Sequence, residues 1–179
     1  IFISKLEIKN NATLDSNFLS CQNDTMSVFI KQGHIKQIFT GYKLMKETIY
    51  DPKLSIYHII SRNDSIYSTP TIATNDLKLN KLTELDTVVN ILGYDCKAIK
   101  MEYSNSESQT FYYTTELAVN PEDYKDYKLY YYNEYINKSK SVYLMSVWET
   151  STFVLTHKAI KIGKEEINDK FFELPNFKK

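Results

Sequence analysis

Residues 92–103, with the sequence LGYDCKAIKMEY, decide the fold expected of this chain. After a turn-forming glycine, Ile99 and Met101 alternate with a lysine and a glutamate. Successive side chains of a β-strand point to opposite faces, so this alternation predicts a strand with one face on a core. A polar break at 104–108 and a second β-rich run at 110–115 follow, and together they predict a hairpin.

The same kind of pattern extends in both directions from this hairpin. Runs rich in apolar and β-branched residues are separated by turn-forming residues about every ten positions, which is the spacing of a meandering antiparallel sheet. Further strands are therefore predicted at 2–8, 25–31, 35–40, 44–50, 55–60, 65–68, 141–150 and 152–162.

A short helix is predicted near residues 121–127. Asn120 can cap it, and Pro121 suits its first position. The next region, 128–136, combines tyrosines at helical spacing with the strand-like run 129–132, so a helix and a strand both stay open there.

About ten strands and little helix predict a mainly β fold (α+β with minor helix) in one domain, residues 1–179. A sheet of this size curls to hide its edges. We therefore expect a single curled antiparallel sheet, an incomplete (half) β-barrel. Its concave face could be filled by its own side chains, covered by a helix or loop, or left as a ligand cavity.

Composition argues against two classes of function. The 22 basic and 22 acidic residues cancel, and Arg62 is the only arginine, so nucleic-acid binding is not expected. No apolar run approaches the roughly 18 residues that a membrane-spanning helix needs, so no transmembrane segment is expected either.

Catalytic and metal-binding signatures are also missing from the sequence. The three histidines, His34, His58 and His157, are isolated, and the four glycines are too scattered for a phosphate-binding loop. The two cysteines, Cys21 and Cys96, either form a disulfide or remain buried thiols, and no Cys-x-x-Cys motif favours metal binding. We expect no enzymatic activity, no metal and no cofactor.

A ligand of this fold would contact the concave face of the sheet, because a trough offers few other surfaces. For every apolar residue on that face, core packing is the alternative interpretation. The residues predicted to form the wall are Ile99, Met101, Phe111, Tyr113, Met145, Trp148, Phe153 and Leu155.

Five segments, in order, resemble a known group of proteins: 26–34 (MSVFIKQGH), 48–57, 91–97 (ILGYDCK), 111–116 (FYYTTE) and 167–175 (INDKFFELP). They are similar to uncharacterised exported Bacteroidetes proteins, which are related to the LolA/LppX-like lipoprotein-carrier superfamily and to GLPGLI-type proteins. The GLPGLI motif itself is absent, and no residue matches the arginine of a lipoprotein carrier. The resemblance therefore implies the fold and apolar-ligand binding, but not lipoprotein transport.

The resemblance further implies a location in the periplasm or at the cell surface. The start of the chain, Ile1-Phe2-Ile3, fits a mature protein whose leader has been removed. The first functional hypothesis is an exported binding module, soluble or surface-tethered, that holds a lipid or acyl chain. The alternative is a non-enzymatic envelope protein that has a filled core and interacts with an envelope protein partner.

Overall fold

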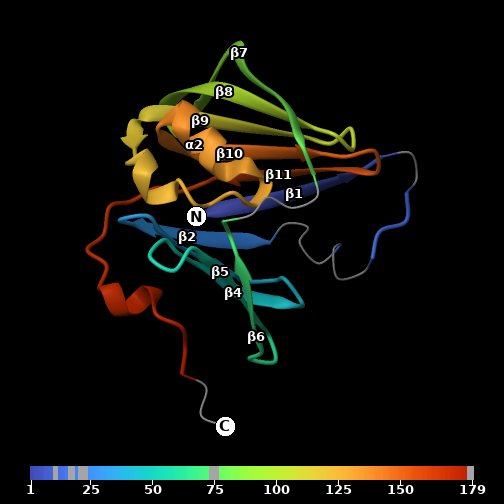
Figure 1. Ribbon diagram of the computed structural model, residues 1–179. Coiled ribbons are helices and arrows are strands. Elements are labelled where there is room, and N and C mark those ends of the chain that lie inside the picture. Colours follow the sequence, from blue (N-terminus) through green and yellow to red (C-terminus); the bar gives the residue numbers. More distant parts are fainter. Residues whose placement is uncertain (10–11, 16–18, 20–23, 73–76, 177–179) are drawn as a thin grey trace.

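The computed structural model of the protein describes residues 1–9, 12–15, 19, 24–72 and 77–176. Strands dominate it, and the short helices named below lie at 121–139 and 169–172 (Figure 1). The elements are β1 (Phe2–Ile8), β2 (Thr25–Lys31), β3 (His34–Phe39), β4 (Met45–Asp51), β5 (Ile56–Ser61), β6 (Ile66–Pro70), β7 (Leu79–Ile91), β8 (Tyr94–Tyr103), β9 (Ser108–Ala118), η1 (Pro121–Tyr124), η2 (Leu129–Tyr131), α2 (Tyr132–Ser139), β10 (Ser141–Glu149), β11 (Phe153–Ala159) and η3 (Asp169–Phe172), where η marks a 3-10 helix.

All the strands belong to one 11-stranded antiparallel sheet in the order β6-β5-β4-β3-β2-β1-β11-β10-β9-β8-β7. The first and last strands of the chain are neighbours, since β1 pairs with β11 along its whole length, from Phe2 opposite Ala159 to Ile8 opposite Phe153. The predicted mainly β class and the single antiparallel sheet are confirmed.

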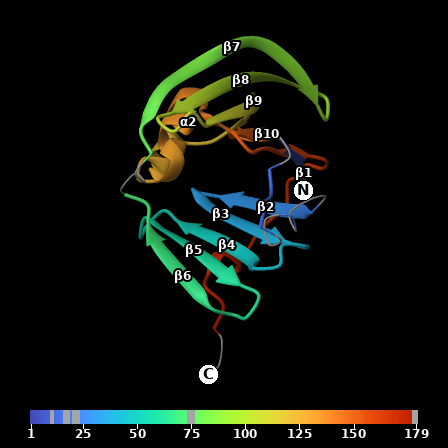
Figure 2. The ribbon, with the colours of Figure 1, turned by 90° about the vertical axis from the view of Figure 1, so that its right-hand side faces the viewer.

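The curl of the sheet follows from its connectivity. Strands β6 and β7 form opposite edges, yet only eight residues separate Pro70 from Leu79. Eleven flat strands would place the edges roughly 48 Å apart, whereas the connecting chain spans at most about 32 Å. The sheet must therefore bend until its edges approach each other, and Figure 2 shows this open trough. The edges do not pair, so the half-barrel prediction is also confirmed.

Tight turns at two hairpins set the register. Leu92 and Gly93, with φ of 54° and 88°, join β7 to β8. Gln32 and Gly33, with φ of 47° and 81°, join β2 to β3. Two consecutive residues with positive φ form the type I′ turn that matches the twist of a hairpin. The predicted hairpin at 92–115 forms as β8 and β9, with Ile99 opposite Phe111.

Residues 121–139, which we call the tyrosine segment, lie inside the curl (Figure 2). The predicted helix near 121–127 is present as η1, and the Asn120 side chain accepts a hydrogen bond from the Glu122 amide as its cap. The region left open at 128–136 is helical, as η2 and the start of α2. The helix is favoured over the strand because it directs Tyr135 and Ile136 into the trough, where both are fully buried.

Residues 164–176, which we call the C-terminal segment, run from the wall of a cavity on the concave side onto the opposite face of β2–β4. The Phe171 ring packs edge-on against Phe29, with ring centroids 4.8 Å apart. The Lys36 ammonium lies 4.8 Å from the centre of the same ring and donates to the Phe171 carbonyl oxygen at 3.1 Å. It also pairs with Glu47 at 3.1 Å, and both charged side chains are about nine-tenths buried.

The tyrosine segment and the C-terminal segment are the two covers of the sheet. Strand β4 shows that they contact different faces of it. Tyr50 stacks on Tyr127 of the tyrosine segment, with centroids 4.3 Å apart. Its neighbour Ile49 points the other way, toward the side of Phe172. Both β4 residues are only 1% exposed. This strand is therefore buried on both faces, which an alternating half-buried strand is not.

Candidate functional sites: a concave cavity and a polar pocket

A cavity of about 990 Å³ lies on the concave side of the sheet; we call it the concave cavity. Its wall comes from β2, β3, β9 and β10, from η2, and from residues 161–167. Val28, Ile30 and Val142 contribute branched apolar side chains. The volume falls at the upper end of the range of about 300–1,000 Å³ that small-molecule sites occupy.

Two of the eight residues predicted for the wall, Phe111 and Trp148, line this cavity. Ile99, Met101 and Tyr113 lie in the neighbouring core cluster, packed with the tyrosine segment. The remaining three lie in other clusters: Phe153 and Leu155 pack with Leu6, and Met145 packs beside Cys96.

The tyrosine segment fills the rest of the trough. Tyr135 stacks on Phe111, with ring centroids 4.3 Å apart, and Tyr132 lies 5.6 Å from Tyr135. Burial raises the pKa of Tyr127 and of Tyr132 well above the ordinary tyrosine value. Both phenols therefore stay neutral at physiological pH, and they offer the cavity aromatic surface and hydroxyl groups without charge.

Several polar groups at the wall of the concave cavity form hydrogen bonds that hydroxyl groups donate. The Gln37 side-chain oxygen accepts from Thr48 at 2.9 Å and from Tyr57 at 3.3 Å. The Tyr103 hydroxyl donates to the Tyr130 carbonyl oxygen at 3.1 Å. Four exposed charged residues also line the cavity, two basic and two acidic: Lys161, Lys164, Glu116 and Glu165. An apolar wall with a charged exposed rim suits an amphiphile.

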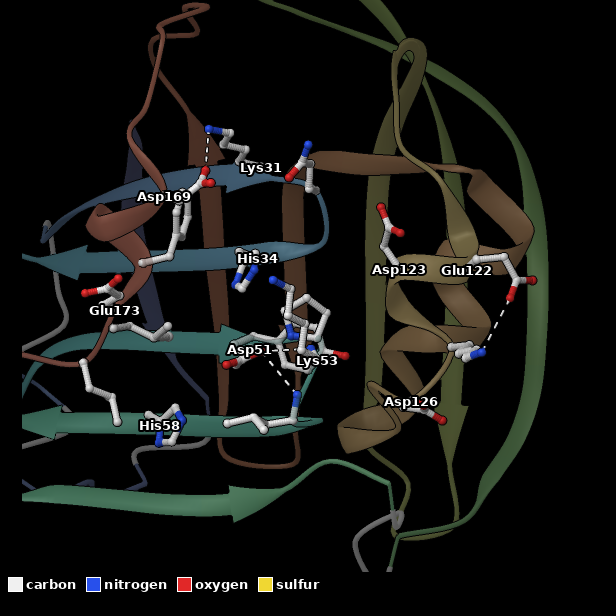
Figure 3. A pocket seen from close by; sticks show the side chains of 18 residues that line it. Lys31, His34, Asp51, Lys53, His58, Glu122, Asp123, Asp126, Asp169 and Glu173 are labelled. Atoms are coloured by element: carbon white, nitrogen blue, oxygen red, sulfur yellow. Dashed lines mark hydrogen bonds and ion pairs between the residues drawn. The ribbon is translucent and has the colours of Figure 1, made fainter.

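A second pocket, of about 680 Å³, lies where the β2–β3 and β4–β5 turns meet η1 and η3; we call it the polar pocket (Figure 3). Gly33 is required at its edge, because φ there is 81° and an added Cβ would lie 2.7 Å from the Asp123 Cβ. Lys31 pairs with Asp169 at 2.6 Å, which ties the β2–β3 hairpin to the C-terminal segment.

His58, which is buried, and His157, which is partly buried, both bond to serine hydroxyls. The His58 Nδ1 atom lies 2.8 Å from Ser68 Oγ, and the His157 Nδ1 atom lies 3.2 Å from Ser4 Oγ. Burial lowers the pKa of His157 to about 4. In the part of the chain that the structure describes, no three His, Cys, Asp or Glu side chains are grouped so that they could hold a metal ion.

The predicted disulfide has one partner outside the described residues, Cys21, so the pairing stays a prediction. Cys96 is fully buried in β8. None of the described helices has the length and apolar character that a membrane span requires.

Sequence reasoning missed most of the wall of the concave cavity and all of the polar pocket. Val28 and Ile30 share one face of β2, and this alternation was visible in the sequence. Nothing local showed that this face would meet β9 and β10 across the trough. The polar pocket joins residues near 51, 123 and 169, and no motif links them.

A comparison with known protein families finds no family model that matches the chain, and a comparison with curated proteins finds no matching relative.

Proposed function

We propose that the protein is an exported, non-enzymatic binding module that holds the acyl chain of a lipid or another amphiphile in the concave cavity. The observation that supports this most is the cavity itself, about 990 Å³ of space beside Val28, Ile30 and Phe111. Each methylene group that such a wall removes from water contributes about 0.8 kcal/mol. Burial alone can therefore supply the affinity, and no chemical step is needed. Placement in the periplasm or at the cell surface rests on the resemblance of the sequence segments alone.

The wall is suited to a flexible chain rather than to one rigid molecule. Its apolar residues come from strands on both sides of the trough, and the exposed charges of Lys161 and Lys164 lie where a polar head group would remain in water. Neutral phenols such as Tyr132 and Tyr143 add hydrogen-bonding groups between these two zones.

The test is displacement of a fluorescent fatty acid from the purified protein, with mass spectrometry of its organic extract. Val28→Trp places a large side chain in the cavity and is expected to weaken probe binding at least about tenfold. The matched control is Val88→Trp, because Val88 is 64% exposed on the edge strand β7. It should bind the probe as the wild type does.

Circular dichroism and thermal melting check that both variants fold. If Val28→Trp does not fold, Val142→Trp on β10 fills the same cavity from the other side. Absence of a co-purifying lipid together with absence of probe binding by the wild type would reject the proposal. Equal probe binding by the wild type and both cavity variants would also reject it.

The second candidate is a structural or interaction protein with no ligand. The observation that favours it is the depth to which the tyrosine segment fills the trough, with Tyr124, Tyr135 and Ile136 all fully buried. The same displacement experiment separates the two candidates. A protein of this second kind binds no fluorescent probe, whether as the wild type or as a variant.

A further inference from the structure

The polar pocket carries an excess of negative charge. Its wall holds six carboxylates and three lysines, and its two histidines are His34 and His58. The carboxylates are those of Asp51, Glu122, Asp123, Asp126, Asp169 and Glu173, and the lysines are Lys31, Lys53 and Lys125.

Two of the three lysines are already paired. Lys31 bonds Asp169 at 2.6 Å, and Lys125 lies 3.9 Å from Glu122. Among the described residues, no ion pair neutralises Asp51, Asp123 or Asp126.

Glu173 is likewise without an ion pair among the described residues, and the other three such carboxylates occupy two walls. Asp51 ends β4, and its Oδ1 accepts from the Lys53 amide at 2.8 Å. Asp123 and Asp126 stand on the opposite side, in and after η1 (Figure 3). Asp123 accepts a bond from the Asn120 amide group at 3.3 Å. The three side chains are half-buried, so their charges are less screened than fully exposed ones.

Two buried polar side chains also line the pocket. His58 is 6% exposed, and its Nδ1 is occupied by Ser68, which leaves Nε2 without a partner among the described residues. The Tyr50 hydroxyl is also buried and unpartnered there. Thr71 lies near it, but the Thr71 hydroxyl donates to main-chain oxygens at 2.8 and 3.0 Å.

The surrounding charges act on both groups. Burial raises the pKa of Tyr50 to about 12, the nearby Thr71 hydroxyl opposes this rise, and the carboxylates of Asp126, Asp51 and Asp123 add to it. Burial lowers the pKa of His58, and Asp51 opposes that shift. A neutral imidazole and a neutral phenol therefore sit within the field of three carboxylates. The phenol oxygen can accept a hydrogen bond from an N–H donor, and so can His58 Nε2 in the tautomer whose Nδ1–H donates to Ser68.

The spread of the carboxylates favours an organic cation over a metal ion. No three metal-ligating side chains of the described residues are grouped around one point. The volume of about 680 Å³ is also far larger than an ion needs. Most of the remaining wall is apolar, with Pro52, Leu54, Phe172 and Leu174. We propose that the polar pocket binds an aliphatic polyamine, with one ammonium group at Asp51, another at Asp123 and Asp126, and the methylene stem on the apolar residues.

The test is calorimetric titration of the full chain with spermidine, beside titrations with magnesium chloride and with a lysine-containing peptide. The double variant Asp123→Asn/Asp126→Asn keeps side-chain size but removes two charges, and it is expected to weaken spermidine binding at least about tenfold. The control is Asp86→Asn, because Asp86 is exposed on the edge strand β7 and lies outside the pocket. It should bind spermidine within about twofold of the wild type.

If the double variant does not fold, Asp51→Asn serves instead, because asparagine can cap the same turn. Spermidine binding that is unchanged in the pocket variants would overturn the proposal. Displacement of spermidine by magnesium at equal ionic strength would also overturn it. So would a protein that binds the lysine-containing peptide but does not bind spermidine. Val28→Trp should leave spermidine binding intact, so this result is independent of the fate of the proposed lipid site.

Discussion

The two segments that cover the sheet differ in the chemistry of their contacts. The tyrosine segment packs onto the concave face through stacked neutral rings, such as Tyr127 on Tyr50. The C-terminal segment is held on the opposite face by lysines, with Lys31 on the Ile167 carbonyl oxygen at 2.6 Å and Lys36 on that of Phe171 at 3.1 Å. Both covers line both hollows, yet the concave cavity is mainly apolar and the polar pocket is charged.

This difference shows that one sheet can support two kinds of site. The strands supply both faces by alternation, and the covering segment decides what remains accessible. Lys36 and Glu47 are strand residues that would be ordinary surface charges without their cover, yet their side chains are only 10% and 11% exposed. The following predictions test whether the two covers stabilise the fold by these different means.

The largest expected effect is loss of an aromatic anchor of the tyrosine segment. Tyr135→Ala removes a fully buried ring that stacks on Phe111, and it should lower the free energy of unfolding by about 4 kcal/mol. Urea denaturation followed by tryptophan fluorescence measures this. Tyr67→Ala is the control, since Tyr67 is 60% exposed on β6, and its cost should stay below about 0.5 kcal/mol. Similar costs for both would mean that the segment adds little stability.

The next effect concerns the charged contact under the C-terminal segment. Glu47→Ala leaves the buried Lys36 ammonium without its carboxylate and should cost about 3 kcal/mol. Because Lys36 also holds the Phe171 carbonyl oxygen, limited proteolysis should cut the C-terminal segment faster than in the wild type. Glu7→Ala removes the carboxylate of an exposed pair with Lys5 and should cost less than about 1 kcal/mol. Equal stability of the two variants would contradict the proposed anchoring.

The free energy of unfolding should depend on pH because of His157, which lies on the concave face. His157 and Phe111 both lie opposite Ser146, so His157 shares that face. Burial lowers its pKa to about 4, below the value of about 6.5 in the unfolded chain. The unfolded state therefore binds the proton first, and stability is present above pH 6.5 and is lost as pH falls toward 4. The loss by pH 4 should be about 3 kcal/mol.

Urea denaturation at pH 7 and at pH 4 gives the drop in the free energy of unfolding between the two pH values. The part due to His157 is the difference between this drop in the wild type and in His157→Gln. The same substitution at His34, which lines the polar pocket on the other face, is the control. A pH dependence that is identical in the wild type and His157→Gln would show that folding does not shift the pKa of His157.

The smallest expected effects on stability come from removing the hydroxyl of one of two tyrosines in the same core cluster. The Tyr124 hydroxyl is buried without a partner among the described residues, so Tyr124→Phe should be neutral or stabilise slightly. The Tyr103 hydroxyl donates to the Tyr130 carbonyl oxygen at 3.1 Å, so Tyr103→Phe should cost about 1 kcal/mol. Thermal melting of the two variants distinguishes these outcomes. A clear destabilisation by Tyr124→Phe would indicate a partner for its hydroxyl.

Much of the sheet could be predicted because the signals are local. The alternation around Ile99 and Met101 and the glycines of the tight turns depend only on neighbouring residues. The region 128–136 could not be assigned in the same way, because its tyrosines suit a strand and a helix equally. Tertiary burial of Tyr135 and Ile136 decided between them.

The sites were much harder to predict than the strands. Phe111 and Trp148 line the concave cavity, which alternation could suggest because it assigns a face to each strand residue; their contact with a ligand stays a prediction. Alternation does not say where along the trough the tyrosine segment lies, and this segment covers Ile99, Met101 and Tyr113 while it leaves the wall of β2 open.

The sequence by itself determined the strands other than β7, most of their turns and the amphiphilic pattern that makes the sheet curl, since each depends on side chains a few positions apart. It did not predict β7 (Leu79–Ile91). Only the tertiary structure decided which residues line a cavity. Pairing of β1 with β11 and the short link between β6 and β7 bring distant strands together. The covers at residues 121–139 and 164–176 then select the surface that stays open, through contacts that no local pattern encodes.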